Sequence, residues 1–151
     1  MTDTEATYAA IPGGPDLVAW FGHVPNFQDA EIVSLDLHRR GPSILRIHFW
    51  NRRNEIDDCG YYVLDRHAVV AFTLEDIMDL QLDGFSHQNV IFGLQLRRAS
   101  ERPDRRPYYS LDPSPDDYEI QLEPCFGLDG SIRCRRISVA FIPGKPDDAR
   151  E

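Results

Sequence analysis

The chain has 151 residues, a hydrophobic fraction of 42% and a formal net charge of -9 at pH 7. This length predicts one domain. The charge argues against a general binder of nucleic acid or anionic membranes, because both need clustered positive charge. It permits a basic protein partner, or it only keeps the protein soluble.

Residues 1–15 are predicted to form a flexible tail, because they end in the turn sequence Pro12-Gly13-Gly14-Pro15. They lack the basic and apolar regions of a signal peptide, and no apolar run approaches the length of a membrane span, so the expected location is the cytoplasm. Asp16 is then predicted to cap a short helix that ends at Gly22.

A β-hairpin is predicted next, because the apolar residues begin to alternate with polar ones at Glu31. The first strand covers 31–38, a turn follows at 41–43, and the second strand covers 45–50. Residues 51–60 are predicted to be a charged loop, and 61–64 a short strand.

The stretch 67–85 fits two structures. The first is a helix over 74–82, and the second is two strands, or one strand with a bulge. The alternation of Met78, Leu80 and Leu82 with polar residues favours the second. The remaining predicted elements are a strand at 89–98, a Pro-rich loop at 100–115, a strand at 118–122, a turn at 126–130 and a strand at 131–142 with a bulge at 135–136.

These elements predict a mostly β protein: an antiparallel sandwich or a strongly curved sheet with one short N-terminal helix. The predicted β-rich domain covers 16–143, and residues 144–151 form a polar C-terminal tail.

The sequence has no motif for a metal, a cofactor or catalysis. Its three cysteines, Cys59, Cys125 and Cys134, show no CxxC spacing, and its five histidines form no HExxH motif. No nucleophile elbow or phosphate-binding loop is present. We therefore expect no catalytic residue, metal ligand or cofactor. Cys59 is the only cysteine expected to be exposed, and Cys125 and Cys134 are predicted to be packed thiols that flank a hairpin turn.

Asp29 and Glu31 flank Ala30 just before the first strand. On an extended backbone their side chains point to the same side, where they are able to bind a basic partner or a cation. Alternatively, Asp29 binds turn amides and Glu31 faces solvent.

Several aromatic residues are candidates for binding or for the core. Trp20, Phe21 and Phe27 have a spacing more typical of core residues than of an interface. Trp50 is on the polar side of its strand, beside His48. This position favours a binding role, although a second small core under the long loop also explains it.

The segment from Trp20 to Ile32, which contains Trp20-Phe21-Gly22 and Pro25-Asn26-Phe27-Gln28-Asp29-Ala30-Glu31-Ile32, resembles the Imm50-type immunity proteins of bacterial polymorphic-toxin systems. The later segments Val70-Ala71-Phe72, Leu80-Gln81-Leu82-Asp83-Gly84-Phe85 and Gly127-Leu128-Asp129-Gly130 follow in the same order, so the resemblance covers about residues 17–142. Such families often have a His where Gln28 stands here.

The resemblance implies a non-catalytic protein that binds and neutralises a cognate toxin domain, and the charge of -9 suits a basic toxin. The expected contacts are Asp29 and Glu31, with Trp50 as an anchor. The alternatives are a small ligand- or metal-binding β-domain, with or without enzymatic activity, and a structural module of a larger assembly. The oligomeric state is left open.

Overall fold

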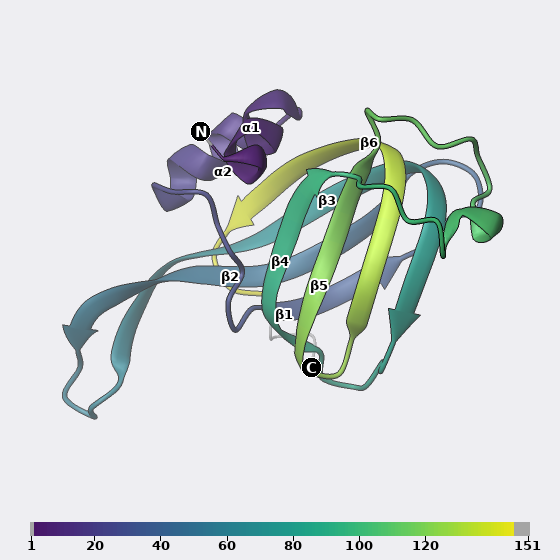
Figure 1. Ribbon diagram of the computed structural model, residues 1–151. Coiled ribbons are helices and arrows are strands. Elements are labelled where there is room, and N and C mark those ends of the chain that lie inside the picture. Colours follow the sequence, from purple (N-terminus) through teal and green to yellow (C-terminus); the bar gives the residue numbers. More distant parts are fainter. Residues whose placement is uncertain (1, 147–151) are drawn as a thin grey trace.

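The strands form one antiparallel sheet that curves until its two ends meet (Figure 1). The computed structural model describes residues 2–146, apart from the side chain of Asn54. The strand order is β1-β2-β3-β6-β5-β4, and Glu31 of β1 pairs with Val90 of β4 to close the sheet. The elements are α1 (Asp3–Ala10), α2 (Gly14–Phe21), β1 (Glu31–Asp36), β2 (Ser43–Ile56), β3 (Tyr62–Asp83), β4 (Val90–Arg98), the short 3-10 helix η1 (Arg106–Tyr108), β5 (Tyr118–Phe126) and β6 (Asp129–Pro143).

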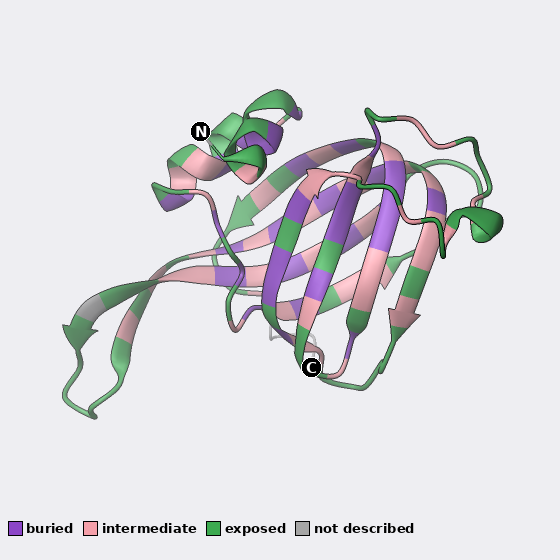
Figure 2. Ribbon diagram, in the orientation of Figure 1, coloured by how far each residue is buried: buried purple, intermediate pink, exposed green. Residues whose placement is uncertain are grey.

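This architecture confirms the predicted mostly β fold with a strongly curved antiparallel sheet. The alternative of a sandwich is excluded, because all the strands belong to one sheet. Buried residues alternate with more exposed ones along the strands (Figure 2). Most of these buried residues are apolar, and their side chains form the core. Phe27 is fully buried there, and its ring centroid lies 5.0 Å from that of Phe49 and 5.9 Å from that of Phe72.

The N-terminal segment differs from the predicted tail over 1–15, because residues Asp3–Ala10 form the helix α1. The Thr2 hydroxyl accepts a hydrogen bond from the Glu5 amide at 3.1 Å, which is an N-terminal cap. Tyr8 and Ile11 are buried in the same core as the sheet. The folded unit therefore begins near residue 3 rather than at 16, and there are two helices instead of one.

The predicted second helix is confirmed as α2, which ends at Gly22 with a left-handed φ of 80°. The predicted cap at Asp16 is wrong, because the N-cap is Gly13, without a side-chain hydrogen bond, and Asp16 lies inside the first turn of the helix. The connection between the helices docks on β6, where the Val139 amide donates to the Pro12 carbonyl at 2.9 Å. This part of β6 lies beyond the stretch that pairs with β5. The helices thus cover an edge that the sheet leaves open.

The predicted hairpin is confirmed by β1 and β2, but the predicted loop over 51–60 is wrong. β2 continues to Ile56, and β3 begins at Tyr62. These ends form a two-stranded ribbon that projects from the closed sheet (Figure 1). The sequence does not indicate this extension, because both faces of the ribbon are exposed to solvent. Apolar residues therefore need not alternate with polar ones along it.

The ambiguous stretch 67–85 belongs to the single strand β3, which excludes the helix over 74–82. The pairing of β3 with β6 shifts register between Ile77 and Asp79. The expected bulge is therefore on β3, and no register shift falls at 135–136 of β6. The strand β4 and the hairpin of β5 and β6 agree with the prediction.

The cysteines differ in part from the prediction. All are free thiols, and Cys134 is buried, but Cys125 is exposed like Cys59. Cys134 pairs in register with Tyr118, so the two cysteines do not face each other across the turn. The predicted C-terminal tail over 144–151 lies largely outside the described residues. In the described part of the chain, no helix is long and apolar enough to cross a membrane.

Candidate partner-binding site

Asp29 lies in the tight turn that leads into β1. Its backbone has a φ of 65°, and its amide donates to the Ile91 carbonyl of β4 at 3.0 Å. Asp is one of the few residues that adopt this left-handed conformation at low cost. Its carboxylate meets Arg52 of β2, with Oδ2 3.1 Å from the guanidinium.

The Asp29 side chain keeps 43% of its surface exposed and the Arg52 side chain 49%. An ion pair at this level of exposure contributes little to stability, because water screens it and both side chains lose entropy. The carboxylate thus stays accessible to a second cation. The prediction that Asp29 only binds turn amides misses this pairing with Arg52.

Glu31 and Trp50 meet around His48. Glu31 is opposite His48 in the register of β1 and β2. The Trp50 ring centroid lies 4.9 Å from that of His48 and 5.9 Å from that of His67. Trp50 is half-buried, so one part of its indole remains at the surface. Asp29, Glu31 and Trp50, the predicted contact residues, are thereby gathered on β1, β2 and the turn before them.

His48 and His67 form a ring pair beneath Trp50. Nε2 of His48 lies 3.0 Å from Nδ1 of His67, and the rings stack with centroids 5.2 Å apart. One nitrogen must donate and the other accept, so both rings cannot be cationic while this hydrogen bond exists. Burial and the nearby Lys145 lower the pKa of His67, and Asp65 opposes that shift.

A shallow cavity of about 240 Å³ borders this site. Nε2 of His23 lies 3.0 Å from the Asn51 side-chain oxygen, within hydrogen-bond distance, and the Asn51 side-chain amide donates to the Phe21 carbonyl at 2.8 Å. Two of its polar side chains, His23 and Asn51, are therefore already engaged by the protein itself. Its volume is below that of most small-molecule sites, which run from about 300 Å³ upward. The region is better suited to surface contact than to enclosing a ligand.

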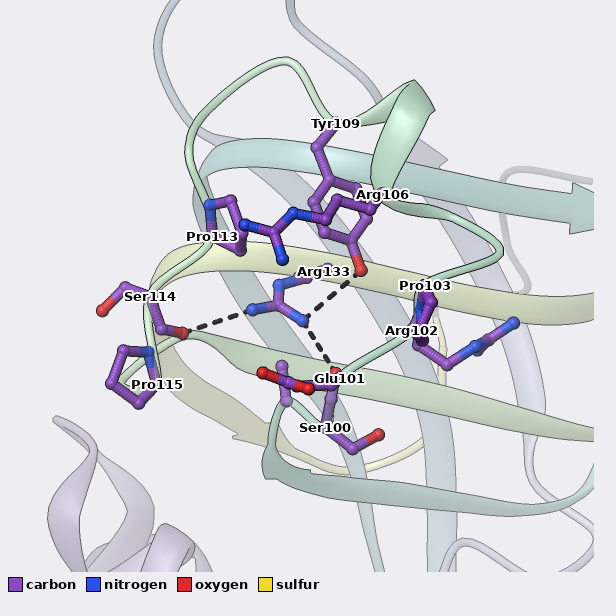
Figure 3. Close-up of a pocket in the computed structure, with 11 residues that line it drawn as sticks. Ser100, Glu101, Arg102, Pro103, Arg106, Tyr109, Pro113, Ser114, Pro115 and Arg133 are labelled. Atoms are coloured by element: carbon purple, nitrogen blue, oxygen red, sulfur yellow. Dashed lines mark hydrogen bonds between the residues drawn. The ribbon is translucent and has the colours of Figure 1, made fainter.

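A second cavity, of about 410 Å³, lies under the loop between β4 and β5 (Figure 3). Arg133 forms its floor and donates to the carbonyls of Ser100 and Ser114 and to the Tyr109 hydroxyl. Its remaining bonds go to Asp117. All five donors of the guanidinium are thus engaged by the protein itself. Arg133 is better explained as an anchor for the loop than as a ligand-binding group.

Among residues 2–146, no group of three or more His, Cys, Asp or Glu side chains is placed to hold a metal ion. Sequence reasoning missed Arg52 and His67 as members of this site. Arg52 falls in the stretch predicted to be a loop, and His67 is brought to His48 only by the pairing of β2 with β3. Neither residue carries a local sequence signal of its role.

Comparisons with protein-family models, with curated proteins and with solved structures find no match to this chain.

Proposed function

We propose that the protein is a non-catalytic immunity protein that binds a cognate bacterial toxin domain and neutralises it in the cytoplasm. The observation that carries this proposal is that the three predicted contact residues lie along neighbouring parts of the chain in space: Asp29 of the turn before β1 pairs with Arg52 of β2, Glu31 of β1 is opposite His48 of β2, and Trp50 of β2 contacts His48. All three residues are partly exposed, so a partner protein is able to reach them.

The charge of the chain supports a basic partner. A net charge of -9 attracts a positively charged domain and speeds their encounter. At the site, a Lys or Arg of the partner is able to share the Asp29 carboxylate with Arg52, or to pair with Glu31. Trp50 supplies the kind of aromatic contact that dominates binding hot spots.

Co-expression with toxin domains encoded beside this chain tests the proposal. Growth is expected to recover only with the cognate toxin, and the purified pair is expected to form a stoichiometric complex. Charge reversal by Asp29→Lys with Glu31→Lys should weaken that complex by about tenfold or more, because it places cations against a basic surface.

The matched control for this reversal is Asp83→Lys with Asp129→Lys. These exposed residues pair at the far end of β3 and β6, and the change in net charge is the same. If both double variants weaken the complex equally, only the net charge matters and the site is wrong. If no neighbouring toxin is neutralised, the proposed function is wrong.

A further inference from the structure

The ends of β2 and β3 form an arm, residues 51–65, that projects from the closed sheet (Figure 1). β1 pairs with β2 only as far as His48, and β6 pairs with β3 only from Ala68 onward. The two strands of the arm therefore pair only with each other. Such an isolated two-stranded ribbon is marginally stable in water by itself.

Most of the arm is exposed (Figure 2), and four of its large apolar residues lie outside the hydrophobic core. The exposed fractions are 64% for Ile56, 72% for Tyr61, 53% for Tyr62 and 40% for Leu64. The tip is nevertheless well formed, because the Asp57 carboxylate accepts hydrogen bonds from the amides of Cys59 and Tyr61. A formed tip with uncovered tyrosines has the character of a protein contact surface.

The charges of the arm separate along its length. Near the base, Arg52 pairs with Asp29 and Arg53 with Asp65. At the tip, Glu55, Asp57 and Asp58 have no cationic partner among the described residues. The tip therefore combines three unneutralised carboxylates with exposed apolar groups.

We propose that the arm docks tip-first onto a basic concave surface of a protein partner. Lys or Arg side chains of that surface pair with the tip carboxylates, and Tyr61 and Ile56 fill its apolar part. A second copy of this chain is disfavoured as the occupant, because it carries the same net charge of -9 and the same acidic tip. In taking the partner to be the toxin domain, this inference rests on the proposed function.

The two exposed thiols allow the arm to be tested by matched cross-linking. A benzophenone maleimide is attached to Cys59 at the tip in a Cys125→Ser variant, and to Cys125 of β5 in a Cys59→Ser variant. Each labelled protein is illuminated in extract of the source cells, and the attached polypeptide is identified, produced and purified. The expected result is one basic protein joined through Cys59 and not through Cys125.

Affinity for that purified protein then tests the contacts. Tyr61→Ala and Asp58→Lys are each expected to weaken binding by about 30-fold, as at an interface hot spot. Phe85→Ala and Asp129→Lys are the controls, because both residues are exposed at the other end of β3 from the arm. Phe85 lies just beyond that end, and Asp129 of β6 pairs with the last residue of β3. Circular dichroism verifies that all four variants stay folded.

The outcomes separate this inference from the proposed function. Three cross-linking results would overturn the docking role of the arm. These are a cross-link from Cys59 to a second copy of the chain, equal cross-linking from Cys59 and Cys125, and no cross-link from either thiol. Arm variants that bind as tightly as the controls would also overturn it. A basic partner that binds through the arm but is not toxic would uphold the arm and reject the immunity function. If a toxin is neutralised and the arm variants bind it as tightly as the wild type does, the immunity function is upheld and the docking role of the arm is rejected.

Discussion

Tyr8 of α1 places a hydroxyl in the core, where no hydrogen-bond partner for it is found among the described residues. An unsatisfied buried polar group costs about 1–3 kcal/mol. Tyr8→Phe removes the hydroxyl and keeps the ring, so we expect the free energy of unfolding to stay the same or to rise by about 1 kcal/mol. Urea denaturation measures this, and a loss of stability would show that the hydroxyl has a partner.

The Tyr8 hydroxyl also makes the stability of the wild type depend on pH. Burial raises the pKa of Tyr8 in the folded protein, so the unfolded chain releases this proton first when the pH passes the ordinary tyrosine value of about 10. The wild type is therefore expected to lose stability above that pH more steeply than Tyr8→Phe.

Cys134 is predicted to be inert, in contrast to the other two cysteines. It is buried on β6, and burial, with smaller contributions from Asp117 and Asp76, raises the pKa of its thiol to about 12. Because the thiolate is the reactive species, Cys134 should not react at neutral pH while the protein is folded. A thiol reagent is expected to titrate Cys59 and Cys125 in the native protein and all three cysteines in denaturant. Reaction of Cys134 before unfolding would contradict its burial.

At the scale of the elements, arginine side chains hold the long loop between β4 and β5 on the sheet. Arg133 bonds to Asp117, and Asp117 Oδ1 also lies 2.9 Å from Arg135 Nε, close enough for an ion pair although the angle does not make a hydrogen bond. Arg105 binds both oxygens of Asp79 on β3. The loop needs these anchors because it contains little regular structure of its own.

Arg133→Met is therefore expected to be strongly destabilising. After this change Asp117 still faces Arg135, but it loses the hydrogen bonds from Arg133, and the carbonyls of Ser100 and Ser114 lose theirs. Breaking a buried ion pair costs about 3–5 kcal/mol when the other charge is left without a partner, so we expect a loss near the lower end of this range, about 3 kcal/mol. Chemical denaturation measures the loss, and protease cleavage within residues 99–117 should accelerate. The control is Arg102→Met, which breaks only the surface pair with Asp104 and should change neither readout. If both variants change stability and protease cleavage equally, Arg133 does not anchor the loop.

The helices depend on a close approach at Gly13. Gly13 and Gly22 both have a left-handed φ, of 83° and 80°, but a Cβ on Gly13 would lie 1.7 Å from the Val139 carbonyl oxygen, whereas one on Gly22 would meet nothing within 4 Å. Gly22→Ala is expected to cost about 1 kcal/mol for the backbone conformation alone. Gly13→Ala should cost clearly more, because it also separates the helices from β6. Thermal unfolding compares them, and equal losses would contradict the docking seen here.

For the whole molecule, the net charge of -9 predicts how the proposed complex forms. Raising the ionic strength from about 10 mM to 150 mM shortens the screening length from about 30 Å to 8 Å. The association rate with a basic partner should then fall about tenfold, while the dissociation rate changes less. Stopped-flow or surface kinetics measure both rates. An association rate that does not change with ionic strength would exclude electrostatic steering.

The β class, the first hairpin, the strands β4 to β6 and the helix α2 are all predictable from the sequence. In each, one face is buried, so the apolar residues must repeat with the period of the strand or helix. The N-terminal helix is not predicted, although Thr2 and Glu5 have the spacing of a helix cap, because the Pro12-Gly13-Gly14-Pro15 sequence that follows it is typical of a flexible linker.

The closure of the sheet, the length of the arm and the partners of Asp29 and Trp50 depend on contacts between distant parts of the chain. Closure depends on pairing between β1 and β4, which are distant in sequence, and curvature accumulates over the whole sheet. The arm has two solvated faces and so leaves no apolar period. Arg52 and His67 reach the predicted contact residues through strand register alone, which local sequence does not encode.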